Sequence, residues 1–156
     1  MSMLRSAPAW TATFGLLELA LTSVHHVYGA YAYDTPWRTQ IALYAVIAAA
    51  LIVVLSAGAH RRRGTAGTAM LWANMILVLI VPVLAIGLVE GGYNHALKNL
   101  IYFAGAADQY RQMFPAPPYE VPADWFFEAT GVLQFPVGIA AGIAAVMALV
   151  RGRHAS

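Results

Sequence analysis

The sequence predicts an all-α membrane protein, a bundle of four transmembrane helices in one domain over residues 1–156. The chain is 60% hydrophobic and only 10% charged, whereas a typical soluble domain is about 25% charged. Its apolar residues gather in four runs, each close to the roughly 20 residues that cross a bilayer core. Charged residues, glycine and proline separate these runs, so each run indicates a single helix.

The composition also excludes several classes of protein. The 9 basic residues are too few and too scattered to follow a phosphate backbone, so no nucleic acid is expected as a partner. The chain has no cysteine, which excludes a disulfide framework, a thiolate metal site and a cysteine nucleophile. The partner that the composition does predict is the lipid bilayer.

The first two predicted helices are joined by a short polar connection around Asp34, and the second and third by the basic run 61–64. The predicted spans are approximately residues 10–31, 37–59, 66–89 and 125–150. A cleaved signal peptide is the alternative for the first span, because Arg5 precedes an apolar stretch. Glu18 and two histidines would be unusual in such a removable segment.

The arginines predict the orientation of the chain. Six of the eight arginines lie before the first span, between the second and third, or after the fourth, which is one side of a four-span protein. By the positive-inside rule this side is cytoplasmic, so both termini are expected inside the cell. The acidic residues avoid these segments. We expect a bacterial inner (plasma) membrane, with the first and third connections on its extracytoplasmic side.

The third connection, about residues 90–124, is expected to contain structure of its own. The pair Gly91-Gly92 predicts the end of the third helix, and Asn94 can cap a new one. Apolar residues then recur at helical spacing up to Ala104, with Lys98 on the other face. This pattern predicts a short interfacial helix. The proline-rich stretch 114–119 cannot be helical, and Asp124 is a suitable cap for the fourth span.

Ionisable residues in or beside a membrane span are costly, so each marks a candidate functional site. Five of them are predicted to meet at the outer mouth of the bundle: His25, His26, Glu90, His95 and Glu128. Nitrogen and oxygen ligands without sulfur suit zinc, iron, copper(II) or manganese. Since adjacent helical residues point about 100° apart, only one of the two neighbouring histidines is expected to face the interior directly. The sequence therefore predicts a site for a divalent transition metal.

Glu18 is the candidate catalytic residue, because a carboxylate near the middle of a bilayer must be protonated, paired or hydrated. Thr22 lies between Glu18 and His26 and can relay a hydrogen bond. Helical rise places Glu18 and Asn74 at one predicted depth, and the two histidines with Gln134 at another. An apolar-walled ligand pocket is expected here. Its predicted lining is Thr22, Asn74, Tyr93, Asn94, Trp125 and Gln134.

Three functions remain open at this level, and the sequence does not decide whether the protein is an enzyme. The first is a metal-dependent site near the extracytoplasmic face, acting on a lipid-like or small apolar substrate or handling the metal itself. The second is a metal-free isomerase or binder of an apolar ligand, with Glu18 exchanging protons. The third is a structural or transport subunit of a membrane complex or homo-oligomer, with Asn74 and Gln134 bonding between helices. Haem held by His95 ranks lower, because His95 is expected outside the hydrocarbon.

Overall fold

The computed structural model describes residues 7–62, 64–117 and 119–152, and every regular element within them is a helix. The helices are α1 (Ala7–Ala32), α2 (Arg38–Arg61), α3 (Thr65–Val78), η1 (Leu79–Leu97), α4 (Lys98–Phe103), α5 (Ala107–Met113) and α6 (Trp125–Gly152). No strand occurs in these described residues. The all-α fold class is therefore confirmed.

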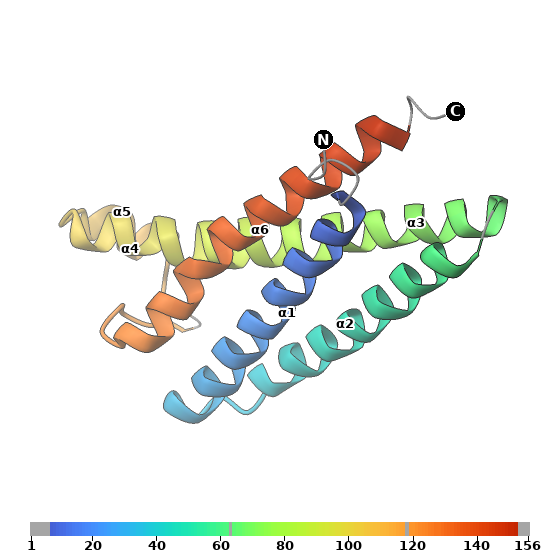
Figure 1. Ribbon diagram of the computed structural model, residues 1–156. Coiled ribbons are helices and arrows are strands. Elements are labelled where there is room, and N and C mark those ends of the chain that lie inside the picture. Colours follow the sequence, from blue (N-terminus) through green and yellow to red (C-terminus); the bar gives the residue numbers. More distant parts are fainter. Residues whose placement is uncertain (1–6, 63, 118, 153–156) are drawn as a thin grey trace.

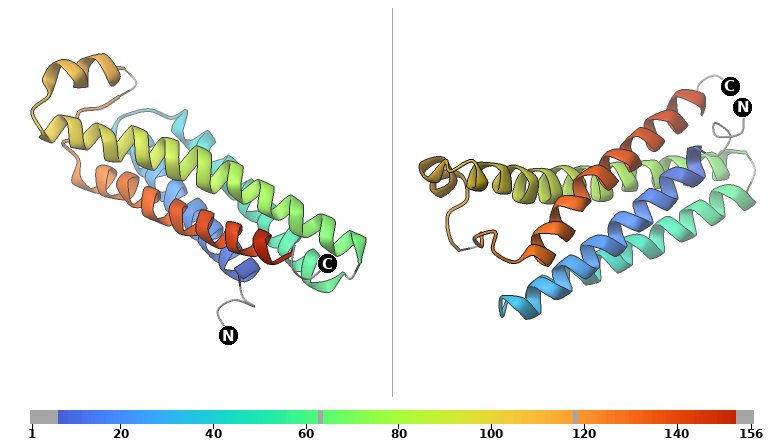
Figure 2. Two further views of the ribbon diagram at one scale, coloured as in Figure 1. Left: turned by 90° about the horizontal axis from the view of Figure 1, so that it is seen from above. Right: turned by 60° about the vertical axis from the view of Figure 1, so that its left-hand side comes forward.

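Four long helical segments lie side by side as a bundle: α1, α2, the continuous run α3–η1–α4, and α6 (Figures 1 and 2). The start of α1, the α2–α3 connection and the end of α6 lie at one end, which we call the turn end. Residues 33–37 and 104–124 lie at the opposite end, which we call the loop end. Neighbouring segments along the chain are thus antiparallel, as in an up-and-down bundle.

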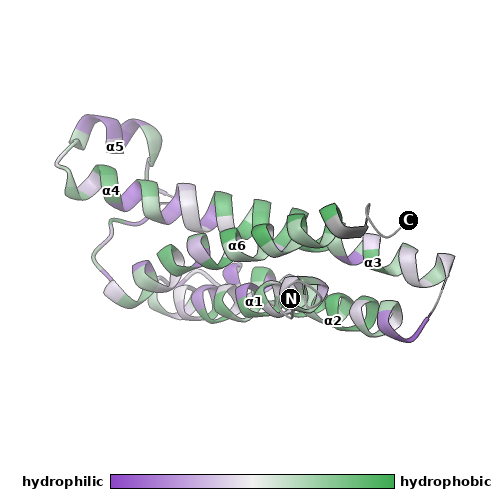
Figure 3. Ribbon diagram, turned by 45° about the horizontal axis from the view of Figure 1, so that its top comes forward, coloured by the Kyte–Doolittle hydropathy of each residue, from purple (hydrophilic) through white to green (hydrophobic). Residues whose placement is uncertain are grey.

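Within the described part of the chain, three helices are long and apolar enough to cross a membrane: Arg38–Arg61, Thr65–Phe103 and Trp125–Val150. This is typical of an integral membrane protein. Apolar residues dominate the middle of the bundle, whereas α5 is largely polar (Figure 3). The helix α1 has 26 residues but is not among these three. Glu18, His25 and His26 lower its hydropathy, and the fourth span stays a prediction.

The sequence predicts that the third helix ends at Gly91-Gly92. In the structure this helix instead continues to Phe103. The stretch Leu79–Leu97 is wound as a π-helix, and it contains Pro82. Gly91 serves close packing rather than termination, because a β-carbon there would lie 2.5 Å from the backbone nitrogen of Phe135 in α6. The predicted short helix after Asn94 is thus the end of one long helix.

The fourth long helix begins as the sequence predicts. The Asp124 carboxylate accepts hydrogen bonds from the backbone N–H groups of Phe126 and Phe127, each at 3.0 Å. This satisfies two of the amides that a helix start leaves free. The Tyr28 hydroxyl also donates to Asp124 at 2.7 Å, which joins the end of α1 to the start of α6. These bonds, the Phe127 amide first, hold the pKa of Asp124 below its usual value.

Candidate metal centre

Three histidines surround one carboxylate oxygen near the loop end of the bundle. Glu90 Oε1 lies 3.7 Å from His25 Nε2, 3.9 Å from His26 Nε2 and 3.5 Å from His95 Nε2. One ligand atom each from His25, Glu90 and His95 lies within 4.8 Å of the others, so this group could hold a metal ion. α1 supplies the two adjacent histidines, and η1 supplies the other two residues.

Both adjacent histidines face the interior, so the expectation that only one does is wrong. His25 is 0% exposed and His26 is 3% exposed. The reason is that α1 packs against α2 on one side and against η1 and α6 on the other, which buries a wide face of the helix. Two rings that point apart can then both reach Glu90, from different sides.

The hydrogen bonds around Thr130 favour one tautomer of His25. Its Nδ1 lies 3.0 Å from Thr130 Oγ1. The Thr130 hydroxyl has one hydrogen, and it donates this to the backbone carbonyl of Phe126 at 2.8 Å or of Phe127 at 3.0 Å. The hydroxyl oxygen therefore accepts from His25 Nδ1–H. A neutral His25 then has a lone pair on Nε2, and this buried atom has no hydrogen-bond partner.

His95 is held in the same tautomer by a carboxylate. Its Nδ1 donates to Glu128 Oε2 at 2.8 Å, and Glu128 Oε1 accepts from Lys98 Nζ at 2.7 Å. An imidazole whose far nitrogen donates to a carboxylate is the usual arrangement behind a metal-ligating histidine. In neutral His95 the other ring nitrogen, Nε2, therefore directs a lone pair towards Glu90. Two imidazole lone pairs and a carboxylate oxygen face one another, and a cation between them would satisfy all three.

The charges around the site leave Glu90 without a fixed cation among the described residues. Arg38 pairs with Glu120, and Lys98 pairs with Glu128. Glu90 meets only the histidines and Asn94, whose Nδ2 donates to Glu90 Oε2 at 2.6 Å. With neutral histidines these five charged groups sum to one negative charge. The charge balance and the ligand atoms therefore both fit a divalent cation.

A cavity of about 250 Å³ lies beside the three-histidine cluster. It is lined by His26, Trp37, Arg38, Ile41, Glu90, Asn94, His95, Lys98, Tyr119, Glu120 and Phe127. The Tyr119 hydroxyl donates to Asn94 Oδ1 at 3.2 Å, which fixes the amide that bonds Glu90. Burial raises the pKa of Tyr119, so the phenol remains a donor at neutral pH. The cavity leaves room for a small molecule beside the ligand atoms.

The structure places the remaining predicted site residues in different surroundings. Glu128 lies behind His95 rather than beside the three converging ligand atoms. Asn94 lines the cavity, whereas Tyr93 and Trp125 are 39% and 79% exposed.

Deeper in the bundle, Glu18, Thr22, Gln134 and Asn74 are all 0–1% exposed. The predicted depths differ from the observed ones. Val78 of α3 lies level with Gly15 of α1. Asn74 is one turn closer to the turn end than Val78, whereas Glu18 is closer to the loop end than Gly15. Asn74 and Glu18 therefore lie at different depths.

Several residues of the site are not evident from the sequence. Lys98 was expected on a water-facing surface, yet it is 2% exposed and bonded to Glu128. Its spacing of three residues from His95 on a helix is the signal that could have placed it there. Arg38 and Glu120 give no comparable local signal, because their pairing joins residues 82 positions apart.

Comparison with known proteins adds no further information on the site. No protein-family model matches the chain, and neither curated proteins nor solved structures give a significant match. The function is therefore inferred from the chemistry of this site alone.

Proposed function

We propose that this is a four-span membrane protein that binds one divalent transition metal near its extracytoplasmic face. His25, Glu90 and His95 are the proposed ligands, with His26 as a fourth. The observation that carries the proposal is the convergence of one ligand atom each from His25, Glu90 and His95 within 4.8 Å, with His25 Nε2 buried and without a hydrogen bond. Two histidines and one carboxylate are the ligand set of many zinc hydrolases and non-haem iron(II) enzymes.

Residues around the proposed ligands have separate supporting roles. Glu128 and Thr130 accept from the Nδ1–H groups of His95 and His25, which keeps each Nε2 free to bind a metal. Lys98 holds Glu128, and Asn94 orients Glu90. A bound divalent metal would supply Lewis acidity, and a redox-active one could also exchange electrons. The adjoining cavity is the proposed place for a small substrate, or for the metal to enter and leave.

The arrangement of α1 supports its role as the fourth span. Its glutamate and histidine side chains are buried in the bundle, whereas its outward side carries Leu17, Val24 and Val27, which are 50–53% exposed. Such a helix can cross a bilayer because only its apolar side meets lipid. Four spans put the basic α2–α3 connection on the cytoplasmic side by the positive-inside rule. The cluster would then lie at the opposite, extracytoplasmic face.

Elemental analysis of untagged protein, purified in mild detergent without chelators, tests the proposal. We expect close to one zinc, iron, copper or manganese per chain. The metal should be lost in Glu90→Gln and His95→Ala and retained in the matched control His60→Ala, which changes an exposed histidine at the turn end. Stripped protein should regain metal on titration. Failure to bind any of the four metals, or equal loss in the His60→Ala control, would overturn the proposal.

A further inference from the structure

One stripe of α1 is polar although it faces the bundle interior. Thr11, Gly15, Glu18, Thr22 and His25 are all buried. They are spaced alternately by four and three residues, so they lie along a single face of the helix. In a bundle this seam is normally apolar. From Glu18 to His25 every residue of the stripe is instead polar, over about 10.5 Å of helix.

From Glu18 to His25, four of the five side-chain polar atoms of this stripe lack protein partners in the described structure. Both carboxylate oxygens of Glu18, the hydroxyl of Thr22 and Nε2 of His25 are buried without a hydrogen bond. The same is true of Gln134 Oε1 on α6, whose amide nitrogen donates to the Thr130 carbonyl at 3.3 Å. Buried polar atoms need partners, and a row of them is a suitable lining for ordered water.

Gln134 lies at the depth of Thr22. The helices α1 and α6 run antiparallel (Figure 1), and His25 contacts Thr130 across them. One turn towards the turn end therefore brings Thr22 level with Gln134. Thr22 and Gln134 therefore lie between His25 and Glu18, and no apolar residue of the stripe separates His25 from Glu18.

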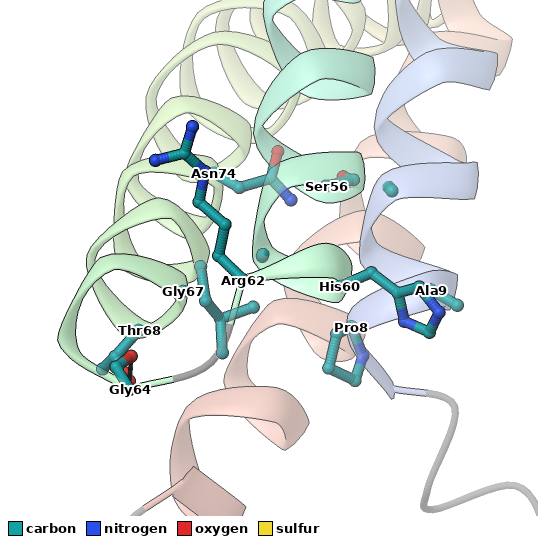
Figure 4. A pocket seen from close by; sticks show the side chains of 12 residues that line it. Pro8, Ala9, Ser56, His60, Arg62, Gly64, Gly67, Thr68 and Asn74 are labelled. Carbon is teal, nitrogen blue, oxygen red and sulfur yellow. Dashed lines mark hydrogen bonds between the residues drawn. The ribbon is translucent and has the colours of Figure 1, made fainter.

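On the other side of Glu18, apolar packing around Gly15 interrupts the stripe. Gly15 packs so closely on α3 and α2 that a β-carbon there would lie 3.3 Å from Val78 and 3.4 Å from Ile52. Both contacts belong to the apolar core that also holds Leu19. Beyond this apolar plug lies a separate cavity of about 660 Å³ at the turn end, which reaches Asn74 (Figure 4). Among the described residues, the other unpartnered polar side chains of the stripe therefore lie on the loop-end side of Glu18.

We propose that Glu18 is a proton-exchange site, reached from the loop-end side past Thr22 and Gln134 and closed towards the turn end by Gly15, Val78 and Ile52. The proton leaves the carboxyl oxygen of Glu18 along this polar row, and another returns by the same route. Only O–H and N–H bonds change. Among the described residues no ion pair reaches Glu18, and the next titratable group along the stripe is His25, two turns away. The site does not require a bound metal.

Infrared spectroscopy of chelator-stripped protein in lipid nanodiscs tests this proposal. The protonated carboxyl group of Glu18 should give a C=O stretching band that is missing in Glu18→Gln. On transfer to D2O the band should shift well before the amide groups of the helix core exchange. Thr22→Val, which replaces the hydroxyl with a methyl group of similar size, should slow the shift by an order of magnitude or more. Asn74→Leu removes a buried polar group beyond the plug and should leave the rate unchanged.

Three results would overturn the proposal: a Glu18 that absorbs only as carboxylate, a band that exchanges no faster than the core amides, or a slowing by Asn74→Leu equal to that by Thr22→Val. Should Glu18→Gln fail to fold, Glu18→Leu provides the same subtraction. Because the measurement uses metal-free protein, its result is independent of whether the proposed metal site is correct.

Discussion

Replacing Glu128 with glutamine is the sharpest test of how the site is held together. Glu128 accepts from His95 Nδ1–H with one oxygen and from Lys98 with the other. Glutamine has an oxygen at only one of these two positions and an NH2 group at the other, so one of the two donors loses its acceptor. Lys98, which is 2% exposed, would then be a buried cation without a counter-charge.

The expected cost has two parts. Removing one partner of a buried ion pair destabilises a protein by about 3–5 kcal/mol, because the remaining charge is uncompensated. Loss of the carboxylate behind a ligating histidine typically lowers metal affinity by about 10–100-fold. We therefore expect Glu128→Gln to unfold more readily in detergent and to bind Zn²⁺ more weakly. Thermal unfolding of the metal-free protein and Zn²⁺ titration of the folded protein measure the two effects separately.

The double variant Glu128→Gln with Lys98→Met separates the two causes. Removing the uncompensated cation should recover much of the lost stability, because neither charge is then buried alone. The metal affinity should stay low, since His95 still lacks its carboxylate. If Glu128→Gln keeps both wild-type stability and wild-type affinity, the arrangement of His95, Glu128 and Lys98 does not hold the site and the reasoning is wrong.

Substitutions at two further positions test the other hydrogen bonds of the fold and the site. Thr130→Val removes the acceptor of His25 Nδ1–H, so Zn²⁺ affinity should fall about tenfold, and Thr130→Ser should restore it; equal affinity in all three proteins would contradict the assigned tautomer. Asp124→Ala should cost about 1 kcal/mol through the lost helix cap. Because the folded protein lowers the pKa of Asp124, this contribution is present above the usual value of 3.8 and is lost as the pH falls through the lower folded pKa. Unfolding of wild type and variant across acidic pH checks the sign, which a difference that grows towards low pH would contradict.

The helical, membrane-type character of the chain and the chemistry available to it follow from the amino-acid sequence alone. Hydropathy over about 20 residues is a local property, so three of the four predicted spans correspond to helices apolar enough to cross a membrane. In a four-span chain the C-terminal ends of the first and third spans lie on the same side of the membrane, so the sequence also predicted that these ends meet. This is why the convergence of His25, His26, Glu90 and His95 could be anticipated from their positions alone.

Which atoms face each other depends on the packing of the helices. Helix rotation and separation, fixed by close contacts such as that of Gly91 with α6, bring three Nε2 atoms to one oxygen of Glu90. The same packing extends the third helix past its two glycines and buries Lys98 against Glu128. Distance along one helix follows from residue number, whereas the relative depth of residues on different helices depends on how the helices pack. The direction of a side chain and its partner depend on helices distant in sequence, and no local pattern encodes them.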